Sequence, residues 1–225
     1  MRIVAVVVRD AAKNHRSWFG RARERLEVDG VTLFLGRGDA VLAFPDTESD
    51  LSAAVRLARE SGAREIGCWA LRPDDRLGER LTGLGFQDGW QPHWLGVDPG
   101  SRSDEPGNHV EETAACIREL PYASAGHEAV LGGDVHHFVA HAGDSIVGHA
   151  VLNVDGETGG IYDMGVSPQF RRQGYARALT LAALAGARRA GCTSVTLNAT
   201  GEGEPVYRSV GFESLGLGMT WWLCP

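Results

Sequence analysis

The sequence has few cysteines, no long hydrophobic run and no excess of basic charge. Its four cysteines form no C-x-x-C pair and have no histidine at metal-ligand spacing, which argues against a disulfide framework or a zinc site. No apolar run approaches the roughly 18 residues that a membrane helix needs. At a formal net charge of −7, the chain also lacks the basic field of a general nucleic-acid binder. These absences predict a cytoplasmic protein with reduced thiols, no metal, and neither a membrane nor a nucleic acid as partner.

The composition that is present is that of a folded domain. Of 225 residues, 43% are hydrophobic and 23% are charged, which is usual for a globular protein and enough for one large or two small domains. The apolar segment from Ile3 to Val8 is too short for a signal peptide and is closed by Arg9 and Asp10. We expect it to form a first β-strand.

A polar stretch rich in turn formers, residues 99–108, predicts a linker between two halves, 1–98 and 109–225. Each half contains a hairpin pattern around a Gly-Asp turn, at residues 31–44 and 137–151. These features indicate a duplicated domain. The alternative is that two α/β units share such hairpins by chance.

Both halves continue in the same order. A strand pattern is followed by a Gly-Phe turn and then by an aromatic strand, residues 90–94 in the first half and 220–223 in the second. The second half has about 24 extra residues between its hairpin and its later strand. In the first half, by contrast, the hairpin leads almost directly into an amphipathic helix at residues 50–60. The extra residues therefore make the second half the candidate for function.

The extra segment includes residues 166–178, which read as a strand end, an arginine-bearing turn and the first turn of a helix. Backbone N–H groups at a helix N-terminus are unpaired and attract anions. Cations are disfavoured there unless an anion is also bound, yet Arg171, Arg172 and Arg177 crowd this end. The segment predicts a phosphate-binding loop. The alternative is a solvated basic turn before an ordinary helix.

Two familiar phosphate loops are excluded, because no Gly-Lys-Ser/Thr follows and the first glycines of G-x-G-x-x-G are absent. The R-x-x-G-x-A pattern of Arg171, Gly174 and Ala176 instead resembles the signature of the GNAT superfamily of acyl-CoA-dependent N-acyltransferases. Asn198, and the Y-x-x-x-G-F pattern that begins at Tyr207, resemble the second motif of that family. Two motifs in the correct order are more specific than either one alone.

The resemblance covers roughly residues 109–225 and implies an α/β (α+β) fold with a central mixed sheet flanked by helices. The first half resembles a degenerate copy of the same fold that lacks the pyrophosphate loop. Acetyl-CoA is then the implied cosubstrate. The residues implied to bind it are Val166, Arg171, Arg172, Gly174, Ala176, Arg177 and Asn198.

In this family two strands part to admit the pantetheine arm, and by position these are residues 160–166 and 193–198. Gly165 is the expected bulge residue. The backbone N–H of Val166 would polarise the thioester carbonyl. Asn198 would hold the cofactor amide or position the acceptor, unless it only forms a local turn.

The family mechanism is direct attack of an amine on the acetyl carbon. We expect Tyr207 to protonate the departing thiolate, unless its side chain only packs on the core. Asp163, expected on one strand face with Ile161 and Gly165, is the leading general base, unless it serves an ion pair or a substrate ammonium. Other bases left open are Glu202, Glu204, His137, His141 and a chain of waters.

These residues predict an N-acetyltransferase that acts on a primary amine, either of a small molecule or of an amino terminus. The alternative is a non-catalytic acyl-CoA sensor or scaffold. Residues 109–134 are short for the first strand and paired helices that usually shape the acceptor pocket, and the sequence does not specify the acceptor. Both a monomer and a homodimer stay possible.

Overall fold

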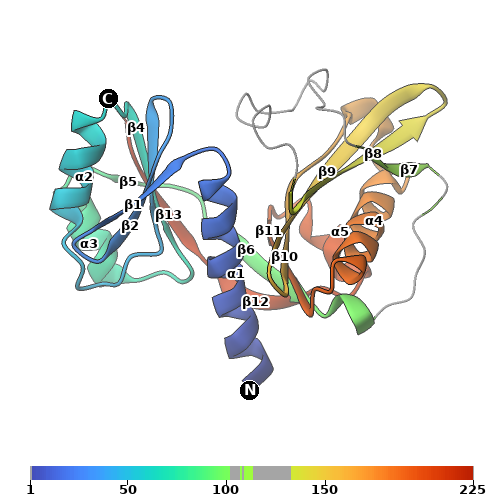
Figure 1. Cartoon of the computed structure of the whole chain (residues 1–225), viewed down its shortest axis with the longest axis horizontal. Helices are drawn as coiled ribbons and strands as arrows, with labels where there is room; N and C mark the ends of the chain where they lie inside the picture. Colours follow the sequence, from blue (N-terminus) through green and yellow to red (C-terminus); the bar gives the residue numbers. More distant parts are fainter. Residues whose placement is uncertain (1, 102–106, 108, 114–132, 225) are drawn as a thin grey trace. The chain divides into compact units, whose positions relative to one another are not determined.

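The computed structural model describes residues 2–101, 107, 109–113 and 133–224, with side chains described from residue 8 onward (Figure 1). The chain forms two compact units. The first comprises residues 1–17 and 95–215, and the second comprises residues 18–94 and 216–225. Each unit contains one mixed β-sheet with helices against it, which confirms the predicted α/β class.

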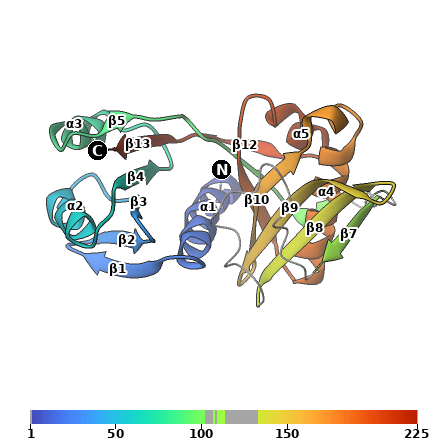
Figure 2. The ribbon, with the colours of Figure 1, turned by 90° about the horizontal axis from the view of Figure 1, so that it is seen from above.

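The second unit is built on a six-stranded sheet in the order β1-β2-β3-β4-β13-β5 (Figure 2). Its helices are α2 (Leu51–Glu60), which matches the predicted helix, and α3 (Asp75–Gly83). The core of this unit lies mainly between these helices and the buried strands. The strands are β1 (Glu24–Val28), β2 (Val31–Leu35), β3 (Asp39–Ala43), β4 (Glu65–Ala70), β5 (Gln87–Asp88) and β13 (Met219–Leu223).

The first unit is built on a seven-stranded sheet in the order β12-β6-β11-β10-β9-β8-β7. Helix α4 (Tyr175–Arg189) packs on one face, where its Gly186 leaves room for the ring of Phe138. Helix α5 (Glu204–Ser209) follows β11. The strands are β6 (His93–Val97), β7 (Val110–Thr113), β8 (Val135–Ala142), β9 (Ser145–Asp155), β10 (Thr158–Val166), β11 (Ser194–Ala199) and β12 (Glu213–Leu217).

The two aromatic strands that end the halves exchange places. Strand β6 comes from the first half of the sequence but lies between β12 and β11 of the seven-stranded sheet. Strand β13, the last strand of the second half, lies between β4 and β5 of the six-stranded sheet. Each sheet is therefore completed by a strand from the other half of the sequence. Only the 3-10 helix η1 (Pro99–Ser101) and isolated residues of the expected linker are described.

The expectation of a first strand at residues 3–8 is wrong, because these residues belong to the helix α1 (Arg2–Gly20). A short run of valine and isoleucine does not distinguish a strand from a buried helix. The residues that follow decide, because the buried positions Ala11, Asn14, His15 and Phe19 recur at helical spacing. Among the described residues, no helix has the length and apolarity needed to cross a membrane.

Candidate functional site

The arginine-bearing segment forms the predicted strand, turn and helix. Strand β10 ends at Val166, the 3-10 helix η3 (Pro168–Phe170) follows, and α4 begins at Tyr175. Gly174 caps the helix at φ 90° and ψ −8°, a left-handed conformation that favours glycine, and nothing lies within 4 Å of where its Cβ would be. The first intrahelical bond runs from Ala178 N–H to the Gly174 carbonyl. The preceding amides of the first turn are thus free of the helix ladder and suited to an anion.

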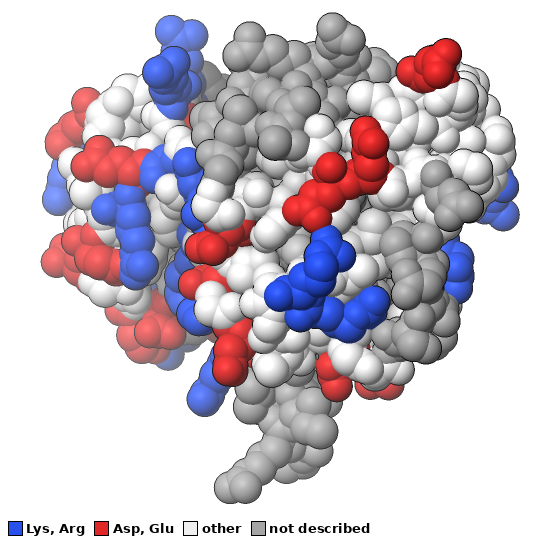
Figure 3. All heavy atoms as spheres, turned by 45° about the vertical axis from the view of Figure 1, so that its right-hand side comes forward, with Lys and Arg blue, Asp and Glu red and all other residues white. Residues whose placement is uncertain are grey.

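The three arginines of this turn are exposed. The Nε atom of Arg171 donates to the Val166 carbonyl at 3.3 Å, and its Nη1 lies 3.9 Å from a carboxylate oxygen of Glu202. Glu202 is 89% exposed, so it compensates little of this positive charge. Arg172 adopts φ 64° in the same turn. Basic and acidic side chains are interspersed on the face shown in Figure 3.

Strands β10 and β11 run parallel but are paired over only three residues, from Thr158 opposite Ser194 to Gly160 opposite Thr196. Beyond this point β10 continues to Val166 and stays paired with β9, while β11 continues to Ala199. The carboxyl ends of the two strands have therefore lost their mutual ladder. The facing edges of these strand ends lie beside the turn that leads into α4, where an extended ligand could be inserted.

A bulge interrupts β10 in the part that is no longer paired with β11. Tyr162 lies opposite Val151 and Gly165 lies opposite His149, so β10 has one extra residue between these pairs. Asp163 is the left-handed residue of the bulge, at φ 51°. The expectation that Asp163 shares a face with Ile161 and Gly165 is wrong, because the extra residue breaks the alternation. Ile161 packs in the core beneath α4. Gly165 lies on the opposite face of the sheet, the same face as Tyr162.

Tyr207 is buried in α5, with its ring edge-to-face against Phe212 at 5.9 Å between centroids. Burial raises the pKa of its phenol to about 12, so the hydroxyl keeps its proton in neutral solution. Asn198 lies half-buried at the end of β11. Of the alternative bases, Glu204 is paired with Arg208 at 3.0 Å and Glu202 is exposed.

The histidines divide between the two sheet faces. His137 is buried on β8, opposite Val151, on the face away from α4. His141 lies 3.1 Å from Glu111. His136 lies 2.7 Å from Glu112, on the face that α4 covers.

Glu112 also binds Arg189 at 2.6 Å. Burial opposes ionisation of Glu112, but hydrogen bonds and charge from His136 and Arg189 outweigh it and lower the pKa of this carboxyl. No cluster of metal ligands occurs among the described residues.

Sequence reasoning missed His149 as a member of the site. It is buried on β9, directly opposite Gly165 and on the same face as Tyr162. Regular pairing continued from Tyr162 would place Gly148 opposite Gly165, so His149 could not be found by alternation without knowledge of the bulge. Asp163, Gly165 and His149 thus lie at or next to the β10 bulge, while Asn198 lies on β11 and Tyr207 on α5.

Comparison with known proteins agrees with this geometry. The sequence profile of the acetyltransferase (GNAT) domain matches residues 107–218, so this part of the chain is similar to that domain. Acyl transfer from acyl-CoA is the activity that this family suggests. A search of curated protein sequences gave no significant match.

Several solved structures share the fold. A GCN5-related N-acetyltransferase from Kribbella flavida superposes with a TM-score of 0.71 at 18% identity, covering 96% of this chain and 95% of that one. A GNAT-family protein from Novosphingobium aromaticivorans has a TM-score of 0.61 at 13% identity, with 97% and 96% covered. A tandem GNAT protein from the clavulanic acid biosynthesis pathway has a TM-score of 0.58 at 13% identity, with 86% and 78% covered. At these identities the likeness establishes the fold alone.

Proposed function

We propose that this protein transfers an acetyl group from acetyl-CoA to a primary amine, by direct attack in a ternary complex. The observation that carries the proposal is the parting of β10 and β11 beyond Gly160 and Thr196, beside the glycine-capped start of α4. A parted parallel pair offers two facing strand edges between which an extended pantetheine arm could be inserted. The adjacent helix start offers N–H groups to the pyrophosphate.

The arginine turn supplies the anion site. The α4 amides near Gly174 and Ala176 would bind the pyrophosphate, with Arg171, Arg172 and Arg177 adding charge-assisted hydrogen bonds. All three arginines are exposed, so their guanidinium groups are accessible to a bound ligand. On β11, Asn198 would hold an amide of the pantetheine arm.

The reaction needs three further groups. The Val166 backbone N–H would stabilise the oxyanion that forms when the amine nitrogen bonds to the acetyl carbon. As the C–S bond breaks, the Tyr207 hydroxyl would give its proton to the thiolate. The proton that the nitrogen loses would pass to the Asp163 carboxylate. The high pKa of Tyr207 favours transfer coupled to thiolate departure, because the sulfur becomes basic enough to accept the phenol proton only as the C–S bond breaks.

The first half of the sequence is proposed to be a degenerate copy that binds no acyl-CoA. Its parallel strands β3 and β4 are paired over five residues, to Ala43 opposite Trp69. The Phe44 N–H then donates to the Trp69 carbonyl at 2.8 Å, which extends the ladder beyond the end of β3. This pair leaves no parted backbone for a pantetheine arm. Duplicated halves at residues 1–98 and 109–225 that exchanged their last strands would explain the sheet order.

The test is CoA release from acetyl-CoA, followed with a thiol reagent, in the presence of amines of several classes: polyamines, amino acids, amino sugars and peptides with free amino termini. Calorimetry with acetyl-CoA and CoA is run in parallel. We expect micromolar binding and turnover with at least one class. Binding without turnover would favour an acyl-CoA sensor or scaffold, and absence of binding would overturn the proposal.

A further inference from the structure

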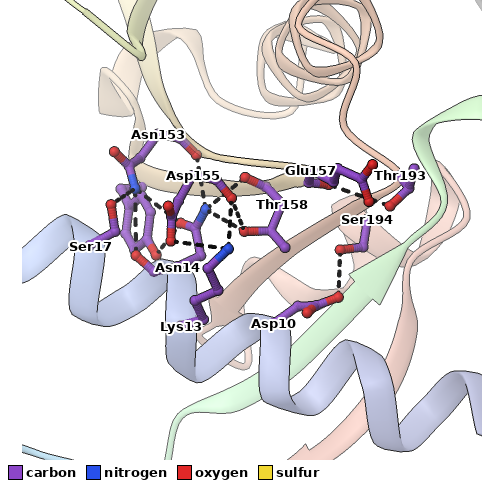
Figure 4. A network of polar contacts seen from close by, with 11 residues as sticks. Asp10, Lys13, Asn14, Ser17, Asn153, Asp155, Glu157, Thr158, Thr193 and Ser194 are labelled. Carbon is purple, nitrogen blue, oxygen red and sulfur yellow. Dashed lines mark hydrogen bonds and ion pairs between the residues drawn. The ribbon is translucent and has the colours of Figure 1, made fainter.

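Helix α1 lies against the face of the seven-stranded sheet that α4 does not cover, and it contacts the sheet through polar groups (Figure 4). Asp10 accepts a hydrogen bond from the Ser194 hydroxyl at 3.0 Å, at the start of β11. Lys13 lies 3.7 Å from an Asp155 carboxylate oxygen at the end of β9. Between them, the fully buried Asn14 contacts both β9 and β10.

The Asn14 amide is held at both ends. Its Nδ2 donates to the Thr158 carbonyl at 2.9 Å and to the Asn153 carbonyl at 3.2 Å. Its Oδ1 accepts from Nδ2 of Asn153 at 3.2 Å and from the Tyr162 hydroxyl at 2.9 Å. A Cβ on Gly160 would overlap this oxygen, so glycine at that position allows the helix to approach. Buried polar groups paired this completely specify a single geometry.

Tyr162 links this amide to the bulge. It is the last residue of β10 in regular register, immediately before Asp163 and three residues before Gly165. Its ring packs against His15 of α1, with 5.3 Å between centroids. Burial, together with the charges of Asp163 and Asp155, raises the pKa of the Tyr162 phenol well above its usual value. The hydroxyl therefore stays protonated and keeps donating to Asn14.

We propose that Asn14 and Tyr162 are positioning residues, through which α1 fixes the β10 bulge and thereby the backbone of Gly165 and Val166. The catalytic part of this assignment rests on the proposed acyl transfer, since Val166 is the proposed oxyanion donor. Neither side chain needs to touch the substrate. An N-terminal helix remote in sequence from both family motifs is thus part of the active-site support.

The test compares Tyr162→Phe and Asn14→Ala with the wild-type chain. Tyr162→Phe removes one hydroxyl, and Asn14 Oδ1 still accepts from Asn153, so this variant should fold. Hydrogen exchange at Gly165 to Ser167, where β10 resumes pairing with β9, should accelerate about tenfold in both variants. With an accepted amine, kcat should fall about tenfold while KM for acetyl-CoA stays within about threefold. The kcat of the double variant should be no lower than that of the slower single variant, because both changes break the same connection between α1 and the β10 bulge.

Asp10→Ala is the matched control, because it removes a different α1 hydrogen bond to the sheet, at the start of β11 and remote from the bulge. It should lower the melting temperature comparably and leave exchange at residues 165–167 and kcat unchanged. Unaltered exchange in Tyr162→Phe would overturn the assignment, as would faster exchange with unaltered kcat. If wild type turns over no amine while exchange still responds, the acyl-transfer proposal fails and the structural role of the pair stands.

Discussion

Gly165 of β10 lies opposite His149 of β9, one residue out of step with the regular pairing that ends at Tyr162. This shift places Asp163 in a left-handed conformation at the point where β10 has already left β11. The bulge therefore does two things at once. It turns the Asp163 backbone out of the regular strand, and it brings a buried histidine beside the backbone proposed to bind the thioester.

Asp163→Asn tests the proposed base. Asparagine tolerates a left-handed backbone as well as aspartate does, so the fold should be kept. Loss of the carboxylate should lower kcat by about 100-fold and change acetyl-CoA affinity little. Asp29→Asn is the matched control, because Asp29 also has a positive φ, 48°, in the turn between β1 and β2. A kcat that matches that of the control would remove Asp163 from the mechanism and direct attention to His149.

Tyr207→Phe tests the proposed acid. The variant keeps the ring that packs on Phe212, so stability should change little. The rate constant kcat should fall about 10- to 100-fold, with acetyl-CoA affinity within a few-fold, because the hydroxyl acts as sulfur leaves. Since the pKa of Tyr207 is raised to about 12, its ionisation should cause no loss of rate between pH 7 and pH 10. An unchanged kcat would contradict the assignment.

Much of the fold could be read from local patterns. The hairpin of β2 and β3 and the strand, turn and helix around Gly174 follow from alternation, turn residues and helical spacing, which act over a few neighbours. The position of β6 and β13 could not be read this way. An aromatic strand could be accommodated in either sheet, and its neighbours there are chosen by long-range packing. Helix α1 was misjudged for a related reason, because its short valine-rich start suits a strand until the buried spacing of Asn14 and His15 is known.

The candidate site was predictable to a similar extent. Residues that act through a motif, such as Arg171 and Gly174, stand at fixed spacing and could be named. Asp163 was named but grouped on one face with Ile161 and Gly165, which the extra residue in β10 places on opposite faces. Asn14 lies 148 positions before Tyr162 and belongs to no motif. Such a contact follows from tertiary packing and has no local signature.

Replacing both Arg171 and Arg177 with alanine tests the phosphate-binding loop. Acetyl-CoA affinity should fall about 10- to 100-fold, because two charge-assisted contacts to the pyrophosphate are lost. The salt dependence of binding should also weaken. A double change of Arg56 and Arg76 to alanine removes the same charge from exposed positions of the other unit and should leave binding unaltered. Isothermal titration calorimetry that gives equal affinities for wild type and the Arg171 and Arg177 variant would contradict the loop assignment.

His15 should make the protein sensitive to acid. Burial lowers the pKa of its imidazole to about 3, from about 6.5 in the unfolded chain. Between these two values the unfolded state binds a proton that the folded state does not, so stability falls as the pH decreases below about 6.5. The expected slope approaches 1.4 kcal/mol per pH unit between about pH 6 and pH 4.

Urea unfolding followed by circular dichroism at pH 7.5, 6 and 5 would measure this slope. In His15→Leu the slope of unfolding free energy against pH should be smaller by about 1.4 kcal/mol per pH unit, the contribution of one proton. This reduction is expected whatever the effect of the substitution on stability at pH 7.5. His109→Leu, at an exposed position before β7, removes a histidine without changing this buried contact. The two variants should therefore differ in slope, and equal slopes would show that another group causes the loss of stability in acid.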